Sequence, residues 1–170
     1  MMKTIVTFGV FDLLHLGHLR LFVNIKKMCG IENKLIVAVQ DSAYILKYKP
    51  DAKIVYSNEE RLEMIRSLKP VDSTIIYTDV DVTIKTVDFD IWAKGPDQIH
   101  SGFQRAIAWC KENNKKVIEI PRTAGISSTL LKSHIIPSRS KERSIVMPDF
   151  IPEQTNTAAD LKAPSQGAGY

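Results

Sequence analysis

The chain has 170 residues, 44% of them hydrophobic and 25% charged, a length that suits one domain with a single core. No apolar run approaches the roughly 20 residues of a membrane span, and the N-terminus lacks a basic-then-apolar leader, so we expect a cytoplasmic protein without membrane association. Cys29 and Cys110 lie far apart, which argues against a disulfide or a zinc site, and the net charge of +4 suits a small polyanion rather than nucleic acid, since no basic run is interleaved with aromatics.

Strand-like and helix-like segments alternate along the chain. Apolar, β-branched runs predict five strands, over residues 3–8, 34–39, 73–77, 90–93 and 116–120. Helical patterns predict four helices and one short helical segment, over residues 18–28, 57–68, 101–113, 127 or 128 to 135, and 80–87. Ser57 and Glu60 have the spacing of a capping box, which marks the start of the second helix.

Continuous apolar strands separated by helices favour a parallel sheet that is covered on both faces. We therefore expect an α/β fold with a Rossmann-like, doubly wound, five-stranded parallel sheet in a single domain, residues 1–136. From residue 137 the composition shifts to Pro, Ser, Lys, Asp, Gln and Ala. Such a segment buries too little surface to order itself, so we expect residues 137–170 to form an extended or disordered tail.

Ligands of doubly wound sheets bind beyond the carboxyl ends of the strands, at the switch point. Polar segments follow four of the predicted strands at this edge. They are residues 9–18 after the first strand, 40–41 after the second, 94–97 after the fourth and 122–129 after the fifth. All of these segments should meet on one edge of the sheet.

The first of these segments reads G-V-F-D-L-L-H-L-G-H and ends in two histidines, His15 and His18. At a strand-to-helix junction the free backbone N–H groups favour an anion. An imidazole there can donate to a phosphate oxygen, and Gly17 lets a phosphate approach the backbone closely. The alternative is that one histidine caps the helix and the other packs in the core.

This pattern resembles the HxGH nucleotidyltransferases, and within them the glycerol-3-phosphate cytidylyltransferase family. The segment from Arg122 to Thr129, R-T-A-G-I-S-S-T, is close to the family signature R-T-x-G-I-S-S/T-T, and the landmarks fit from residue 2 to residue 135. The resemblance implies transfer of CMP from CTP to a small phosphomonoester, with release of pyrophosphate. The acceptor would be glycerol 3-phosphate or another small phosphorylated alcohol, amine or amino-acid derivative. The product would be a CDP-activated precursor of a surface polysaccharide or a teichoic-acid-like polymer.

The resemblance also implies roles for individual residues. Catalytic roles fall on His15, His18, Lys47 and Arg122, and acceptor contacts fall on Lys47 and Lys49. Contacts to the nucleotide fall on Phe8, Gly9, Val10, Phe11, Gly17, Arg61, Gly95, Asp97, Ile126, Ser127, Ser128 and Thr129. Asp12 is expected to orient the turn rather than to touch an anionic substrate.

Alternatives remain open for several of these residues. Lys47 and Lys49 would face the same side of an extended segment, but they also fit a solvated loop. Arg61 also fits an ion pair with a neighbouring glutamate on its helix. Val10 stands where relatives often carry a hydroxyl, and the segment 98–103 departs from the glycerol-phosphate enzymes, which leaves the acceptor open.

No carboxylate cluster is evident, so we expect Mg²⁺ to be carried mainly by the nucleotide and no metal site on the protein. The first helix is apolar over more than one face, which fits either deep burial or a homodimer contact, and the resemblance favours a homodimer. Two other functions stay open. They are an ATP-dependent adenylyltransferase of the phosphopantetheine or FAD-synthesis kind, and a nucleotide-binding sensor without turnover.

Overall fold

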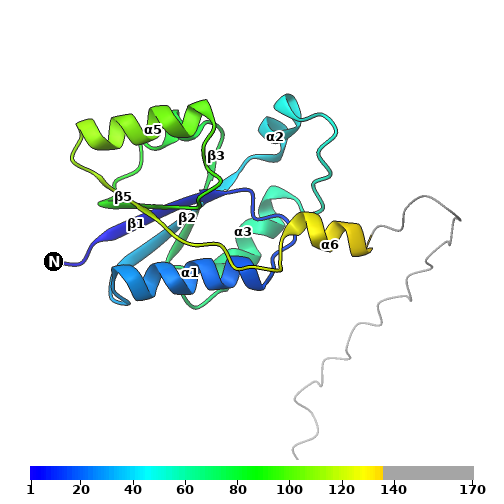
Figure 1. Cartoon of the computed structure of the whole chain (residues 1–170), viewed down its shortest axis with the longest axis horizontal. Coiled ribbons are helices and arrows are strands. Elements are labelled where there is room, and N and C mark those ends of the chain that lie inside the picture. Colours follow the sequence, from blue (N-terminus) through cyan, green and yellow to red (C-terminus); the bar gives the residue numbers. More distant parts are fainter. Residues whose placement is uncertain (136–170) are drawn as a thin grey trace, which may run out of the picture. The chain divides into compact units, whose positions relative to one another are not determined.

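The computed structural model describes residues 1–135, and the predicted tail lies outside the described residues. These residues form a five-stranded sheet with the order β3-β2-β1-β4-β5, in which every neighbouring pair is parallel (Figure 1). The strands are β1 (Thr4–Gly9), β2 (Lys34–Gln40), β3 (Ser73–Tyr77), β4 (Ile91–Lys94) and β5 (Lys116–Glu119). The predicted five-stranded, parallel, Rossmann-like sheet is confirmed.

Helices cover both faces of this sheet. They are α1 (Leu16–Cys29), α2 (Ser42–Tyr48), α3 (Asn58–Arg66), α4 (Val80–Thr83), α5 (Ser101–Glu112) and α6 (Ser128–Ile135). Figure 1 shows α1 and α3 on one face and α5 on the other. Among residues 1–135, no helix is long and apolar enough to cross a membrane.

The two faces have separate apolar cores. Phe22 and Ile25 of α1 and Ile65 of α3 are fully buried against one face. Ala106 and Cys110 of α5 are fully buried against the other. Each helix buries one side against its own face of the sheet. With helices on both faces and the strand order β3-β2-β1-β4-β5, the sheet is wound in both directions from its centre. The winding reverses between β1 and β4, so the carboxyl ends of these two strands flank the switch point.

The capping box predicted at the start of α3 is present. The Ser57 hydroxyl accepts a hydrogen bond from the Glu60 backbone N–H at 3.1 Å, and the Glu60 carboxylate accepts one from the Ser57 N–H at 2.7 Å. These two bonds satisfy free N–H groups of the first turn and fix where α3 begins.

The expectation of an extended segment at residues 47–49 is wrong. Lys47 lies in α2 and Lys49 is the residue that ends this helix. The two side chains therefore do not face the same side, as residues two apart in a strand would. The helix begins because Asp41 accepts a hydrogen bond from the Tyr44 N–H at 2.8 Å. The Lys47 ammonium lies over the Tyr48 ring, 5.4 Å from its centre. The short helix expected over 80–87 is also shorter than predicted and ends at Thr83.

Candidate active site

The turn between β1 and α1 is held in an unfavourable backbone conformation. Phe11 and Leu13, on either side of Asp12, have φ angles of 53° and 50°, in the left-handed region that L-residues rarely adopt. The Phe11 ring packs over Gly9, where an added Cβ would lie 2.7 Å from it. Such a conformation persists only where the surrounding contacts determine it, and such positions cluster at functional sites.

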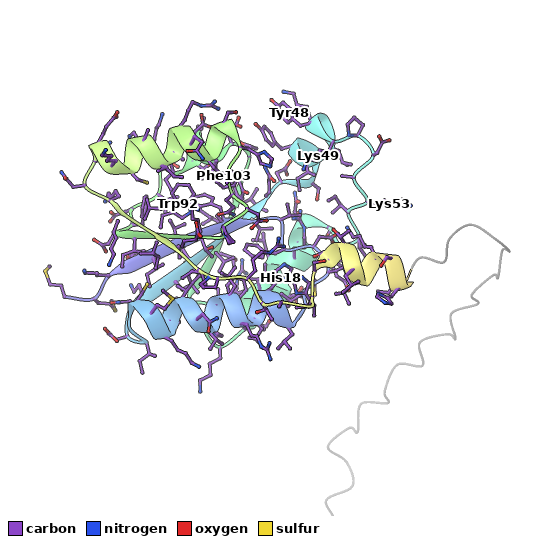
Figure 2. The ribbon with its side chains drawn as sticks, in the orientation of Figure 1. His18, Tyr48, Lys49, Lys53, Trp92 and Phe103 are labelled. Carbon is purple, nitrogen blue, oxygen red and sulfur yellow. The ribbon has the colours of Figure 1, made fainter. Side chains whose placement is uncertain are left out.

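This turn delivers His15 to the N-cap of α1 and His18 to its first turn. Their rings are stacked, with centres 3.7 Å apart and an interplanar angle of 18°. The His15 Nδ1 accepts a hydrogen bond from the Gly17 N–H at 3.0 Å, so a neutral His15 carries its proton on Nε2. Figure 2 shows His18 at the N-terminal end of α1, near the start of α6.

Both imidazoles are held in the neutral form. Burial, with the nearby charges of His15 and Arg122, lowers the pKa of His18 from 6.5 to about 3. Burial and Arg122 also lower the pKa of His15. The His18 Nδ1 is buried and has no hydrogen-bond partner among residues 1–135. A buried ring nitrogen without a partner disfavours the protonated imidazole, in which both nitrogens need an acceptor.

The rings face a cavity of about 420 Å³ at the carboxyl edge of the sheet. Most residues that the sequence singled out line this cavity. They are Phe8, Gly9, Val10, Phe11, His15, Gly17, His18, Lys49, Gly95, Asp97, Arg122, Ile126, Ser127, Ser128 and Thr129. The segments after β1, β4 and β5 therefore meet at one edge, as predicted. Lys47 and Arg61 are not part of the cavity wall.

Arg61 is fully buried instead, and every donor group of its guanidinium is bonded to protein. The acceptors are Ser57 O, Val10 O, Gln40 O, Ser42 Oγ and Asn58 Oδ1, at 2.6 to 3.3 Å. Neither expectation for this residue, a phosphate contact or an ion pair with a neighbouring glutamate, describes this arrangement. Because its partners seal the guanidinium from the cavity, Arg61 has no access to a phosphate in this structure.

Arg122 provides an exposed cation on the wall of the cavity. Its guanidinium lies 3.4 Å from the Asp97 carboxylate, and both side chains are more than half exposed. Gly125 has a φ of 76°, which turns the chain from this segment into α6. The Ser127 hydroxyl accepts a hydrogen bond from the Leu130 N–H at 3.1 Å, so Ser127 caps α6 as predicted.

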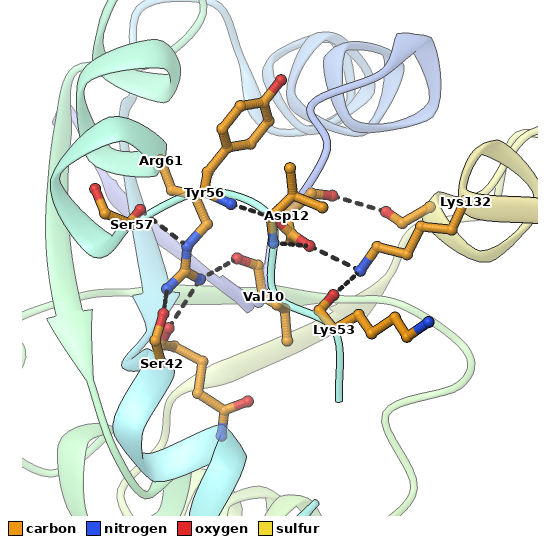
Figure 3. Close-up of polar contacts among 11 residues, drawn as sticks. Val10, Asp12, Ser42, Lys53, Tyr56, Ser57, Arg61 and Lys132 are labelled. Carbon is orange, nitrogen blue, oxygen red and sulfur yellow. Dashed lines mark hydrogen bonds and ion pairs between the residues drawn. The ribbon is translucent and has the colours of Figure 1, made fainter. Parts of the chain in front are cut away.

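Asp12 orients the turn, as expected. Only 3% of the residue is exposed, and its carboxylate accepts hydrogen bonds from the N–H groups of Val55 and Tyr56 at 3.1 Å (Figure 3). It also accepts one from the Lys132 ammonium at 2.8 Å. Burial alone would raise the pKa of Asp12, but the bonds from Lys132, Tyr56 and Val55 together lower it.

Sequence reasoning missed two side chains at this site. Lys132 lines the cavity and binds Asp12. Its four-residue spacing from Ser128 places both on one face of α6, which was the available signal. The Gln98 side-chain amide donates to Phe8 O at 2.6 Å and accepts from the Gly95 N–H at 3.3 Å, bridging the ends of β1 and β4. No local pattern reveals that bridge, because Phe8 lies 90 residues from Gln98 along the chain.

The fold and the site together define an α/β protein whose switch-point cavity gathers imidazoles, cations and helix N–H groups, an environment for a phosphorylated ligand. A family model described as cytidylyltransferase-like matches residues 6–134. The chain belongs to this family, within the HxGH nucleotidyltransferase superfamily.

The individual proteins that this chain resembles are named for different activities. The chain is 30% identical to the glycerol-3-phosphate cytidylyltransferase of Staphylococcus aureus over 144 residues, which are 82% of this chain and 100% of that protein. It is 35% identical to the FAD synthase of Methanopyrus kandleri over 98 residues, 56% of this chain, and spans only 64% of that relative's length. A crystal structure of the lipopolysaccharide core biosynthesis protein from Thermoplasma volcanium matches 72% of this chain and 99% of its own, with a TM-score of 0.60 and 27% identity.

Proposed function

We propose that this protein is a cytidylyltransferase that transfers CMP from CTP to a small phosphomonoester and releases pyrophosphate. The observation that carries the proposal is the stacked pair of neutral imidazoles, His15 and His18, on the wall of a cavity that also exposes Arg122. This set of groups supplies hydrogen-bond donors and positive charge, which is what a triphosphate undergoing substitution requires.

The reaction needs no general base. A phosphate monoester has its second pKa near 6, so at pH 7 the acceptor is largely a dianion and attacks as it is. One of its oxygens forms a bond to the α-phosphorus of CTP, and the bond from that phosphorus to the oxygen bridging to the β-phosphate breaks. The electron pair of the broken bond leaves with pyrophosphate, and no proton has to move.

The residues of the cavity have complementary roles in this scheme. His15, with its proton on Nε2, donates to an oxygen at the α-phosphorus, and His18 does the same at the bridging oxygen. Arg122 and the start of α6, with the hydroxyls of Ser127 and Thr129 and the backbone N–H of Ser128, bind the departing phosphates. Lys49, on the wall nearest α2, attracts the acceptor phosphate. Lys47 is given no part in this scheme, because its ammonium lies over Tyr48 and the residue does not line the cavity.

The nucleotide itself would be held by backbone as well as side chains. Gly9 and Val10 at the end of β1, with Gly95 and Asp97 after β4, lie on the wall around the switch point and would contact the nucleoside part. Val10 has no hydroxyl, so its contribution is limited to its backbone and its apolar surface. Phe8, Phe11, Gly17 and Ile126 shape the same wall.

Mg²⁺ would neutralise part of the triphosphate charge. Within residues 1–135 no group of three or more His, Cys, Asp or Glu side chains is placed to hold a metal ion. The two carboxylates of the cavity wall, Asp12 and Asp97, are each paired with a cation, Lys132 or Arg122. The described residues therefore do not fit a metal cage of their own, and the cation would be held by the oxygens of the triphosphate.

Two observations support CTP as the donor. The match to the S. aureus glycerol-3-phosphate cytidylyltransferase extends over the whole of that relative, including the segment 122–129 that carries the R-T-x-G-I-S signature. The FAD synthase of M. kandleri, in contrast, is matched over 64% of its length. Its 35% identity nevertheless favours a second candidate, an adenylyltransferase that uses ATP.

A donor and acceptor panel tests the proposal. The protein is incubated with Mg²⁺, one of the four ribonucleoside triphosphates, and one small phosphomonoester at a time, and pyrophosphate release is measured with an acceptor-free control. The proposal expects acceptor-dependent release with CTP. Release with ATP alone would establish the second candidate. Binding of a triphosphate without release for any acceptor would contradict both and support a sensor.

The panel should include glycerol 3-phosphate and other phosphorylated alcohols, amines and amino-acid derivatives, together with FMN and phosphopantetheine as acceptors for the second candidate. The segment 98–103 separates this chain from the glycerol-phosphate enzymes, and His100 and Phe103 from this segment line the cavity. We infer that this segment helps to select the acceptor, whose CDP-activated form would be consumed by a transferase that builds a surface polymer.

A further inference from the structure

We propose that Lys132 is a positioning residue that locks α6 and the segment 53–56 to the histidine-bearing turn through Asp12. The kinetic part of this inference rests on the proposed function, and its structural part does not. In this arrangement the imidazole pair and the start of α6 form one rigid unit, so the groups at both ends of the scissile bond keep a fixed spacing.

The Lys132 side chain is committed on two sides. Its ammonium donates to the Asp12 carboxylate at 2.8 Å and also to the backbone carbonyl of Lys53 (Figure 3). The side chain is only 24% exposed. Although it borders the cavity, two of its three donors are therefore used within the protein. A lysine held in this way is poorly suited to follow a phosphate during the reaction.

Asp12 is the residue on which the restraining bonds converge, and we call this set of bonds the lock. It is the residue between the two left-handed positions, Phe11 and Leu13, and its carboxylate is almost fully buried. The N–H groups of Val55 and Tyr56 bind the carboxylate from one side and Lys132 binds it from the other. These bonds supply the surrounding support that an unfavourable backbone conformation requires.

A second bond runs from the same helix to the same turn. The Ser128 hydroxyl donates to the backbone carbonyl of Asp12 at 2.8 Å. Ser128 and Lys132 are one helical turn apart on α6, so the helix holds both the backbone and the side chain of Asp12. Ile126, just before α6, lies within 3.2 Å of where a Gly17 Cβ would be, so the helix start and the histidine turn are in contact.

Loss of the Lys132 ammonium should therefore act on alignment. The Asp12 carboxylate would be left buried beside two N–H groups with no cation, and the turn would lose its strongest restraint. A displacement of about 1 Å at a reacting centre can cost on the order of 10²-fold in rate. We expect Lys132→Met to lower kcat by about 10- to 100-fold while the KM for CTP changes by less than about threefold.

The chain offers a matched control at the opposite end of the sheet. Lys26 makes the same pair of bonds, to the Asp72 carboxylate at 2.6 Å and to the backbone carbonyl of Asn33, and Asp72 likewise accepts a backbone N–H, that of Leu35. None of these residues lines the cavity. Because the Asp72 side chain is 44% exposed and that of Asp12 only 3%, Lys26→Met should cost less stability than Lys132→Met, and it should leave kcat unchanged.

A double-mutant cycle and a rescue separate positioning from general instability. In an Asp12→Asn background the Lys132→Met change should add little, because the partner charge is already gone. Lys132→Arg keeps the charge and the hydrogen bonds and should retain most of the turnover. Neither result is expected if Lys132 acts only as part of a stable fold.

The pH profile gives a third readout. The charged groups that face Asp12 are Lys132 from α6 and Arg61 from α3, and the titratable His18 of α1 also faces it. With Lys132 removed, burial of Asp12 is opposed by fewer favourable bonds, so its pKa rises. The kcat of Lys132→Met should then fall on the acid side at a higher pH than that of Lys26→Met.

Amide hydrogen exchange tests the lock without an activity assay. Lys132→Met should speed exchange at the Val55 and Tyr56 N–H groups at least tenfold, while Lys26→Met leaves them unchanged. Unchanged exchange and unchanged kcat in Lys132→Met would overturn the inference. A raised KM for CTP at constant kcat would also overturn it, because that result identifies a direct phosphate contact. If the wild-type protein transfers no nucleotide, the proposed function fails, and the exchange result alone decides on the lock.

Discussion

The imidazole pair is built to be neutral before a ligand arrives. Burial is the largest cause of the low His18 pKa, and the stacked His15 and nearby Arg122 add to it. A protonated pair at 3.7 Å would repel itself, whereas two neutral rings stack and leave a hydrogen-bond donor for an incoming anion. A bound anion would oppose the effect of Arg122 and raise the pKa of the His18 ring.

The low pKa predicts how the His18 ring titrates. In the free protein the His18 ring signals in an NMR titration should stay flat between pH 5 and pH 8, since its pKa is about 3. Addition of inorganic pyrophosphate should raise that pKa. A His18 that titrates near 6.5 in the free protein, like an exposed imidazole, would contradict the burial that the structure shows.

The same shift links stability to pH. The unfolded chain binds a proton at His18 below about pH 6.5, and the folded protein does so only below about pH 3. Between these values the unfolded state binds more protons, so the free energy of unfolding should fall as the pH is lowered through this window. Denaturant unfolding at pH 7 and pH 5 measures the loss. A His18→Gln variant should show a shallower dependence on pH.

Gly17 is required for space rather than for flexibility. An added Cβ would lie 2.8 Å from His15 Cε1 and 3.2 Å from Ile126, so Gly17→Ala must move the His15 ring. We expect kcat/KM to fall at least about tenfold, although alanine favours helix by up to about 1 kcal/mol. Gly102→Ala in α5 is the control, because Gly102 does not line the cavity and its Cβ would meet its nearest neighbour at an ordinary 3.6 Å. Equal activity in the two variants would remove the argument for Gly17.

Among the elements, α3 holds the site from a distance through Arg61. Its guanidinium donates to the backbone carbonyls of Val10, which follows β1, and Gln40, which ends β2, and thereby joins two strand ends to a helix. A buried cation with five hydrogen bonds cannot be removed without leaving acceptors unpaired.

Arg61→Met should therefore lower the free energy of unfolding by about 3 kcal/mol, the scale of a broken buried charge network. Arg66→Met on the same helix is the control. Arg66 donates to the Thr74 hydroxyl at an exposed position, and its loss should cost no more than about 0.5 kcal/mol. Chemical denaturation of the two variants measures both values. Similar small losses would show that Arg61 is not the support described here.

The prediction of helices from the sequence failed where the helix is short and its residues also favour strands. The sequence showed α3 because Ser57 and Glu60 form a complete capping box. It missed α2, which has seven residues and a single visible signal, Asp41 at its N-cap. The tyrosines and isoleucine of α2 also favour strands. Arg61 was misassigned because its partners, Val10 and Gln40, are 51 and 21 residues away.

For the whole molecule, the order of strands and helices was readable because fully buried parallel strands have continuous apolar runs. The site was readable to the extent that it follows the carboxyl ends of these strands, which the topology gathers at one edge. What the sequence could not give was the orientation of individual side chains across that edge, as the Gln98 bridge to Phe8 and the Lys132 bond to Asp12 demonstrate.

The surface of α1 leaves the predicted homodimer testable. Phe22 and Ile25 are buried in the core, whereas Leu16 and Met28 are 47% and 58% exposed. We expect light scattering at high protein concentration to report twice the mass of the chain, with Met28→Glu shifting the mass toward that of a monomer. A wild-type protein that stays monomeric at every concentration would contradict this prediction.

The central claim is that His15 and His18 polarise the phosphate bond that breaks. The most direct test is the rate of pyrophosphate release from CTP, with the best acceptor, by wild-type protein and by His18→Ala, whose folding is checked by circular dichroism. We expect His18→Ala to lose about 10²-fold or more in kcat with an intact fold. Turnover within a few-fold of wild type would contradict it.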